Sequence, residues 1–115
     1  MKTRLGIDIV HISKFKKLME NRDFIKKVFH ISEVRNYRPE HLAGIFATKE
    51  AFFKAINKNP NPNWLEVEVK NKKTGLPVLA ISNELKKKAK IKEAGISISH
   101  DKDYAIAAVI CYLSG

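Results

Sequence analysis

The C-terminal segment 104–113 (YAIAAVICYL) is the feature that most constrains the fold of this chain. Its residues are apolar, without the alternation of apolar and polar side chains that is typical of a strand with one face in solvent. A strand with this pattern is expected to be buried on both faces. A chain of 115 residues has little other material to cover both faces of a closing strand, so we expect self-association. At about half of the roughly 20 residues that a membrane-spanning helix needs, the segment is too short to cross a membrane.

Strands and helices are mixed along the rest of the chain, without a regular βαβ alternation. Strands are expected over 5–12, 64–69, 78–81 and 96–99, the last in a hairpin with 104–113. Helices are expected over 14–20, 23–29, 32–38, 40–56 and 83–92, and the Asn- and Pro-rich segment 57–63 is expected to be a loop. No repeat or linker divides the sequence. We therefore expect one domain, 1–115, of the α+β class, with an antiparallel sheet packed against helices.

Composition narrows the class of partner. Lys and Arg total 22 against 12 Asp and Glu, a net charge of +10, and 44% of the residues are hydrophobic. The chain is thus too apolar for a disordered basic tail, and its charge favours a polyanionic partner, with nucleic acid the simplest candidate. The single Cys excludes an internal disulfide and is typical of a reducing compartment. Because Asp8 interrupts the N-terminal apolar stretch, we expect no signal peptide and a cytoplasmic protein.

Asp8 is the first candidate functional residue. It stands between Ile7 and Ile9 in an otherwise apolar strand, where an unpaired carboxylate costs several kcal/mol of desolvation. One interpretation is a carboxylate at the strand end that faces solvent or pairs with Lys or Arg. The other is a carboxylate held rigidly for a metal ion or a proton.

The helix expected over 40–56 contains a second group of candidates in FATKEAFFKA. Glu50 and Lys54 lie one turn apart, off the apolar stripe and beside alanines, so a ligand or another backbone has room to approach them. The alternative is an ordinary surface ion pair worth a few tenths of a kcal/mol. Lys49 falls in the middle of the apolar stripe, which requires either that its side chain reach solvent or that it meet a buried anion.

His100, at the end of SISH, completes the candidates. Such a His is either structural or a donor or base beside a polyphosphate. The other His residues and Cys111 lack zinc-ligand spacing, and there is no Walker A motif, GxGxxG or nucleophile elbow. Separated carboxylates with a nearby Lys suit Mg²⁺, which binds one or two protein carboxylates together with water and substrate phosphates. The residues therefore favour phosphate chemistry slightly over plain nucleic-acid binding.

Three segments, in order, resemble one known family. They are GIDIVHISKF, FATKEAFFKAI and SISHDKDYAIAAVI, with Gly75-Leu76-Pro77 between the second and third. The family pattern runs G-I-D-I-V-E-I, R-F-A-A-K-E-A-x-x-K-A, G-K-P and S-I-S-H-x-x-x-Y-A-x-A. It is typical of the small phosphopantetheinyl transferases of bacterial fatty-acid synthesis, the holo-acyl-carrier-protein synthases. The resemblance extends over essentially the whole chain and implies the 4′-phosphopantetheinyl transferase fold.

The resemblance also implies a reaction, the transfer of 4′-phosphopantetheine from coenzyme A to a serine of an apo acyl carrier protein, with release of adenosine 3′,5′-bisphosphate. By this resemblance Asp8 and Glu50 are expected to bind Mg²⁺, and both belong with Lys54 to the expected catalytic set. Lys54, His100 and Lys49 are expected to bind coenzyme A, Lys49 less directly. Glu50 is a candidate for taking the serine proton, directly or through water.

Family members are trimers with active sites at the subunit interfaces, so the resemblance implies a homotrimer. It also implies that an acidic carrier protein docks on the basic helix after the first strand, for which Lys14, Lys17 and Arg22 are the candidates. The expected partners are therefore a carrier protein and coenzyme A, with no nucleic acid and no membrane. Two alternatives remain: a small basic nucleic-acid-binding domain, and a family member that has lost its activity and now acts as a binding subunit.

The chain departs from the family pattern at three places. Ile45 stands where Arg is usual, and His11 replaces an acidic residue. The motif helix runs into Asn57-Lys58-Asn59-Pro60 instead of a Gly-rich segment. The change at Ile45 removes one basic contact to the substrate or the carrier. Because glycine lets a backbone approach a ligand closely, the change at 57–60 concerns the adenosine side of the coenzyme A pocket.

Overall fold

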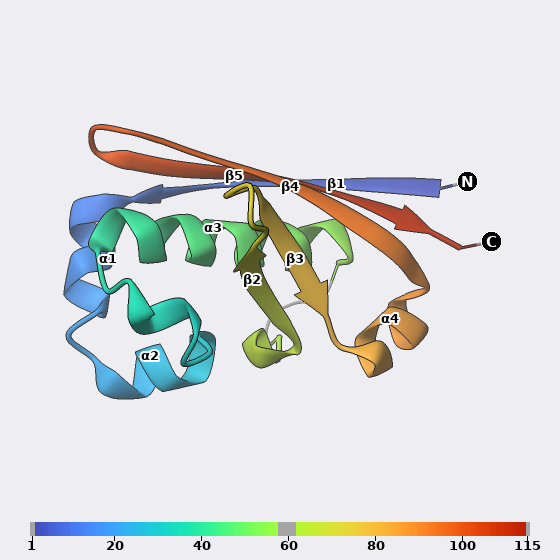
Figure 1. The fold of residues 1–115 in the computed structure, drawn as a ribbon, viewed down its shortest axis with the longest axis horizontal. Helices are drawn as coiled ribbons and strands as arrows, with labels where there is room; N and C mark the ends of the chain where they lie inside the picture. Colours follow the sequence, from blue (N-terminus) through green and yellow to red (C-terminus); the bar gives the residue numbers. More distant parts are fainter. Residues whose placement is uncertain (1, 58–61, 115) are drawn as a thin grey trace.

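The structure is a computed structural model that describes residues 2–57 and 62–114 (Figure 1). The expected loop 57–63 falls partly outside these residues. Along the chain the elements are β1 Lys2–His11, α1 Ile12–Leu18, α2 Arg22–Val28, the 3₁₀ turn η1 Glu33–Arg35, α3 Pro39–Ala55, the 3₁₀ turn η2 Trp64–Glu66, β2 Val67–Asn71, β3 Pro77–Ile81, α4 Asn83–Ala89, β4 Ile91–Asp101 and β5 Tyr104–Leu113. The mixed, antiparallel arrangement confirms the α+β prediction.

The strands form two antiparallel sheets. One has the order β1-β5-β4, and the other is the β2–β3 hairpin. In the larger sheet Asp8 of β1 lies opposite Ala107 of β5, and Ala107 in turn lies opposite Ile98 of β4. The expected hairpin between the last two strands is present, and the closing strand β5 is the centre of this sheet.

Helix α3 lies along one face of the β1-β5-β4 sheet (Figure 1). It is buried nearly all round, because β1, β5, β4 and α1 all pack against it. Its Ala47 and Ala51 have no exposed surface, which lets the strands approach its axis. Helix α3 thus forms the centre of the core, and the site residues that it carries have fixed positions relative to the sheet.

The other face of the sheet is apolar and exposed. Leu5, Ile7 and Ile9 of β1 are 76%, 61% and 60% exposed. Strand β5 alternates between buried residues such as Ala107 and exposed residues such as Ile106. The prediction that β5 is buried on both faces is therefore not met within one chain, because no segment among residues 2–57 and 62–114 covers the outer face.

Several boundaries differ from the sequence-based expectation. The helix expected over 32–38 is only the 3₁₀ turn Glu33–Arg35, and β1 spans Lys2–His11 rather than 5–12. Helix α4 ends at Ala89 because Lys90 adopts a left-handed conformation, with φ of 58°, that terminates a helix. Strand β4 consequently begins at Ile91 rather than at residue 96. Residues Trp64–Glu66 form a 3₁₀ turn instead of strand. Within the described ranges, no helix combines the length and apolar character needed to cross a membrane.

Candidate active site

A close backbone approach between β1 and α3 creates the site. A Cβ built on Gly6 would lie 1.8 Å from the carbonyl oxygen of Ala51, so no other residue is accommodated there. Side chains alternate along a strand, so Gly6 and Asp8 face α3 while Ile7 and Ile9 face outward. Asp8 therefore lies on the inner face of the sheet, 9% exposed, and does not face solvent at a strand end.

Lys54 of α3 forms an ion pair with Asp8. Its Nζ donates to Asp8 Oδ1 at 2.7 Å and to the backbone carbonyl of Ile7 at 3.4 Å. The hydrogen bond with Asp8 raises the pKa of Lys54, against the opposing effect of burial, so the amine stays charged. The side chain of Lys54 is 53% exposed, which leaves its ammonium group accessible to an anion from solvent.

Glu50 faces Asp8 from α3. Burial, followed by hydrogen bonding and charge repulsion from the Asp8 carboxyl, raises the pKa of Glu50 to about 8. The second oxygen of Asp8, Oδ2, is buried and has no hydrogen-bond partner. Two neighbouring carboxyls, one with an orphaned oxygen, are a poor arrangement unless a cation or a proton lies between them. In the absence of a metal the raised pKa of Glu50 favours a proton between the two carboxyls, and a small hard cation fits the same place.

The number of acidic groups bears on which cation fits. Within the described part of the chain, no group of three or more His, Cys, Asp or Glu side chains is arranged to hold a metal ion. Sites built entirely from protein ligands, such as tetrahedral zinc sites, need more donors than Asp8 and Glu50 supply. Mg²⁺ binds through one or two carboxylates and completes its shell with water and substrate phosphates.

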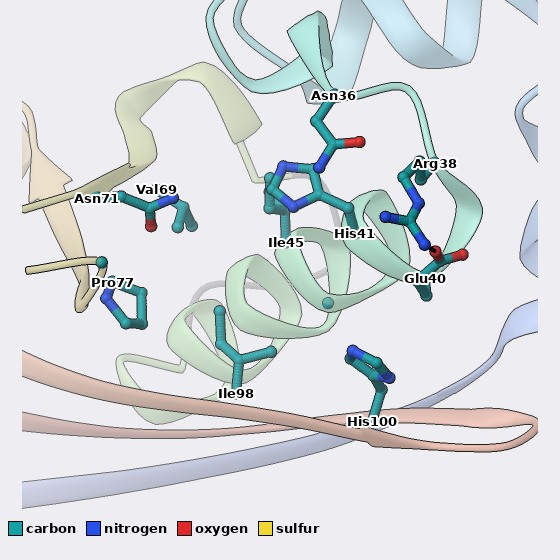
Figure 2. Close-up of a pocket in the computed structure, with 12 residues that line it drawn as sticks. Asn36, Arg38, Glu40, His41, Ile45, Val69, Asn71, Pro77, Ile98 and His100 are labelled. Carbon is teal, nitrogen blue, oxygen red and sulfur yellow. Dashed lines mark ion pairs between the residues drawn. The ribbon is translucent and has the colours of Figure 1, made fainter.

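His100 lies in a separate pocket of about 600 Å³. In Figure 2 its ring points from β4 toward the first turns of α3, where Arg38, Glu40 and His41 lie. Arg38 forms an ion pair with Glu40 at 2.7 Å, and burial lowers the pKa of His41, which favours its neutral form. The pocket is lined by Asn36, Arg38, Glu40, His41, Gly44, Ile45, Val69, Asn71, Gly75, Pro77, Ile98 and His100. One apolar wall and several hydrogen-bond donors suit a ligand with a planar body and an anionic group.

The pocket contains one departure from the family pattern, Ile45, and one motif that follows it, the Gly75-Leu76-Pro77 turn. Ile45, the residue in place of the usual Arg, contributes to its lining, as do Gly75 and Pro77 of the Gly-Leu-Pro turn. Ile45 is also 3% exposed and packs in the core with Leu42. The departure at position 45 therefore replaces a charged group with part of the apolar wall.

Lys49 lies neither beside Asp8 nor in the pocket of His100. Its side chain has no exposed surface, and its Nζ donates to Glu33 Oε1 at 2.8 Å and to the carbonyl of Val28 at 2.6 Å. The expected contact between Lys49 and coenzyme A is therefore wrong for this conformation, because the ammonium group is fully enclosed. The expectation that a Lys on the apolar stripe needs a buried anion is confirmed. Glu33 was not predicted to be this anion, and the position of Lys49 on the apolar stripe was the only sequence signal that such an anion exists.

The basic residues expected to contact a carrier protein are exposed. Lys14 and Lys17 lie on α1, and Arg22 begins α2. Beside α1 is a second cavity of about 630 Å³, lined by Ser13, Lys16, Lys17, Met19, Glu20, Tyr37 and Pro39. Two basic residues, Lys16 and Lys17, thus line a partly apolar depression together with the acidic Glu20. A basic helix beside such a depression suits an acidic protein surface with apolar contacts.

Comparison with known proteins identifies the family. The model of the 4′-phosphopantetheinyl transferase superfamily matches residues 4–109. The chain belongs to this superfamily. As a phosphopantetheinyl transferase, it is 38% identical to a holo-acyl-carrier-protein synthase of Campylobacter hominis, with 96% of this chain and 98% of that protein covered. It is 34% identical to the synthase of Caldicellulosiruptor bescii, with 92% and 94% covered.

Solved structures of other phosphopantetheinyl transferases share the fold. The Helicobacter pylori holo-acyl-carrier-protein synthase, solved in complex with coenzyme A, matches with a TM-score of 0.87 at 29% identity, over 94% of this chain and 99% of that one. The ACPS–CoA complex from Chronobacterium ammoniagenes matches with a TM-score of 0.86 at 34% identity, over the full length of both. The transferase fold expected from the sequence is therefore confirmed.

Proposed function

We propose that this chain is a holo-acyl-carrier-protein synthase, which transfers 4′-phosphopantetheine from coenzyme A to a serine hydroxyl of an apo acyl carrier protein. Adenosine 3′,5′-bisphosphate is the second product. The observation that carries the proposal is the unpartnered Oδ2 of Asp8 beside Glu50, with the ammonium of Lys54 at 2.7 Å from the same carboxylate. The relatives of this name, matched over almost the whole chain, support it.

Asp8 and Glu50 are the residues that would hold Mg²⁺. When bound, the metal neutralises negative charge on the pyrophosphate of coenzyme A. Lys54 adds an accessible positive charge beside the same carboxylate, where it would bind a pyrophosphate oxygen and stabilise charge on the leaving group. Glu50 is our candidate for accepting the serine proton, because Asp8 is already engaged by Lys54.

His100 and its pocket are proposed to bind part of coenzyme A. The structures of relatives in complex with coenzyme A support a site of this kind in the fold. In this chain the pocket combines the apolar wall of Ile45 and Pro77 with donors from Arg38 and His100. Since neither Asp8 nor Glu50 lines this pocket, the two places are separate within one chain.

A homotrimer with active sites between its subunits would account for both that separation and the exposed sheet face. The outward side chains of Leu5, Ile7 and Ile9 supply an apolar contact surface, and an adjacent subunit would bring a second pocket toward each Asp8–Glu50 pair. Lys14, Lys17 and Arg22 would attract the acidic carrier and raise its association rate. We place the reaction in the cytoplasm, where the single Cys111 stays reduced.

One experiment tests the proposed function directly. The protein is incubated with coenzyme A, Mg²⁺ and an apo acyl carrier protein, and the intact mass of the carrier is measured. We expect a gain of one phosphopantetheine arm with the wild type and none with Asp8→Ala or Glu50→Ala. No gain across several carriers would refute the transferase. Strongly salt-dependent binding of DNA or RNA, unaffected by either substitution, would then support the nucleic-acid alternative.

A further inference from the structure

Among the ion pairs of the described residues, only the one between Lys49 and Glu33 has both side chains fully enclosed. Both side chains have no exposed surface, and Lys49 Nζ lies 2.8 Å from Glu33 Oε1. The Lys49 ammonium also lies 5.5 Å from the centre of the Phe29 ring. Burying each of these two charges costs several kcal/mol, so their presence in the core calls for a physical explanation.

The pair is the centre of a network that joins four elements. Glu33 of η1 accepts from the amide of His30 through Oε1 and from the amide of Val69 in β2 through Oε2, both at 2.8 Å. Lys49 of α3 also donates to the carbonyl of Val28, at the end of α2. The segment from α2 to η1 and the strand β2 are thereby attached to α3 by directional bonds.

Stability alone does not explain this network. Replacing a buried ion pair by well-packed apolar residues of similar volume is often neutral or stabilising. Apolar side chains also tolerate small displacements of a helix, since their contacts have no preferred direction. Hydrogen bonds are directional, so the Lys49–Glu33 pair restricts how far α3 can slide or rotate, which an apolar pair of the same size would not do to the same extent.

The position of Lys49 on α3 connects this restriction to the site. Lys49 directly precedes Glu50, and on the β1 side of the same helix Ala51 meets Gly6. Helix α3 is therefore held by a backbone contact on one side and by the buried ion pair on the other. A rotation or shift of α3 would move Glu50 and Lys54 away from Asp8, and catalytic groups need placement within about 0.5 Å.

We propose that Lys49 and Glu33 are positioning residues for the reaction: they fix α3 so that Glu50 and Lys54 face Asp8. The inference rests on the proposed transferase function. Neither residue touches substrate in this role, since both side chains are enclosed. The pair instead contributes to the turnover rate through the geometry of the residues that follow Lys49 in α3.

The central test is the double variant Glu33→Leu/Lys49→Met, which replaces the pair by apolar residues of similar size. Thr48→Val is the matched control, because Thr48 is also fully buried in α3 but its hydroxyl donates only to the carbonyl of Gly44 in the same helix, at 2.8 Å. Wild type, control and double variant are assayed by carrier mass for kcat and for the KM of coenzyme A, and their Tm values are measured.

We expect kcat of the double variant to fall about 10- to 100-fold, with Tm within a few degrees of wild type and KM for coenzyme A changed less than about 2-fold. Thr48→Val should keep the wild-type kcat. A folded double variant with wild-type kcat would overturn the proposal. If the double variant does not fold, Glu33→Gln decides in its place, since it keeps the shape of the side chain but removes its charge and replaces one accepting oxygen with an NH2 donor: a lower kcat supports the positioning role and an unchanged kcat refutes it.

The wild type in the same assay shows whether the proposed function fails or only the positioning role. If the wild type transfers nothing to any carrier, the transferase assignment fails, and the positioning role is then judged from amide NMR spectra alone. We expect the amide shifts of residues 50–54 to change in the double variant and to stay near wild type in Thr48→Val. Unchanged shifts for 50–54 in the double variant would show that the pair does not set the position of α3.

Discussion

Gly6 and Ala51 are in backbone contact across the interface between β1 and α3. The space between them excludes even a methyl group, because a Cβ on Gly6 would lie 1.8 Å from the Ala51 carbonyl oxygen and 3.2 Å from the Cβ of Ala55. This contact sets the distance between the strand that carries Asp8 and the helix that carries Glu50 and Lys54. The site therefore depends on a residue without a side chain.

Gly6→Ala should destabilise the protein and reduce transfer together. The added methyl group forces β1 away from α3, at a cost of about 1–3 kcal/mol, and moves Asp8 away from Lys54. Gly95→Ala is the matched control, since its Cβ would lie 3.4 Å from the Ile110 side chain, an ordinary contact distance. Urea unfolding and the carrier-mass assay check both effects. A Gly6→Ala variant as stable and active as Gly95→Ala would contradict this account of the contact.

Glu50→Gln should separate activity from stability. Transfer should be lost, because one of the two proposed Mg²⁺ ligands is removed. In metal-free buffer the variant should be more stable than wild type, by about 1 kcal/mol or roughly 4 °C in Tm, because the unfavourable burial of a titratable carboxyl beside Asp8 is removed. Thermal unfolding with and without Mg²⁺ measures this difference, with the exposed Glu93→Gln as control.

Mg²⁺ should raise the Tm of wild type and of the Glu93→Gln control, since a ligand that binds the folded state stabilises it. It should leave the Tm of Glu50→Gln almost unchanged. An equal shift in all three proteins would mean that the metal does not bind between Asp8 and Glu50.

Ile7→Asp should dissociate the proposed trimer. Ile7 is 61% exposed in the single chain, so the substitution should cost little in folding of the subunit, whereas a charge in an apolar subunit contact is strongly unfavourable. Sedimentation velocity should show monomers, and transfer should fall with the loss of the interfacial sites. Ile31→Asp, at a residue 82% exposed away from this face, should remain trimeric. A wild-type protein that sediments only as a monomer at micromolar concentration would refute the trimer itself.

Cys111 should make the stability depend on pH in the alkaline range. Burial raises the pKa of the Cys111 thiol from 9.0 to about 11. Between these values the folded protein retains a proton that the unfolded chain releases, so stability should fall as the pH rises from 9 to 11, by up to about 2 kcal/mol. Urea unfolding at several pH values should show a smaller slope in Cys111→Ala. An identical slope in both proteins would contradict the shift.

The same burial should protect the thiol from reagents. At pH 8 only about one molecule in a thousand carries a Cys111 thiolate in the folded state, given a pKa of about 11. Iodoacetamide should therefore label the native protein slowly and the urea-unfolded protein rapidly, as followed by intact mass. Fast labelling under native conditions would show that β5 opens readily at Cys111.

Local patterns were sufficient to predict most of the elements and to single out Asp8, Glu50 and Lys54 as candidate residues. The apolar residues on both sides of Asp8 and the apolar stripe of α3 are local patterns, which depend on neighbours a few residues apart. Lys49 could be recognised as a residue in need of a buried anion for the same reason. The helix end at Lys90 was not predictable in this way, since a non-Gly residue in a left-handed conformation leaves little sequence signal.

Only the tertiary structure decided which distant residues meet. The anion for Lys49 is Glu33, and the cation for Asp8 is Lys54, 46 positions further along the chain. The path of the backbone, above all the contact of Gly6 with α3, brings these groups together and leaves His100 in another pocket. The sequence by itself thus determined the types of residue and their local faces. Their pairing required the folded chain, because a hydrogen bond or an ion pair depends on distances of a few ångströms that periodicity does not encode.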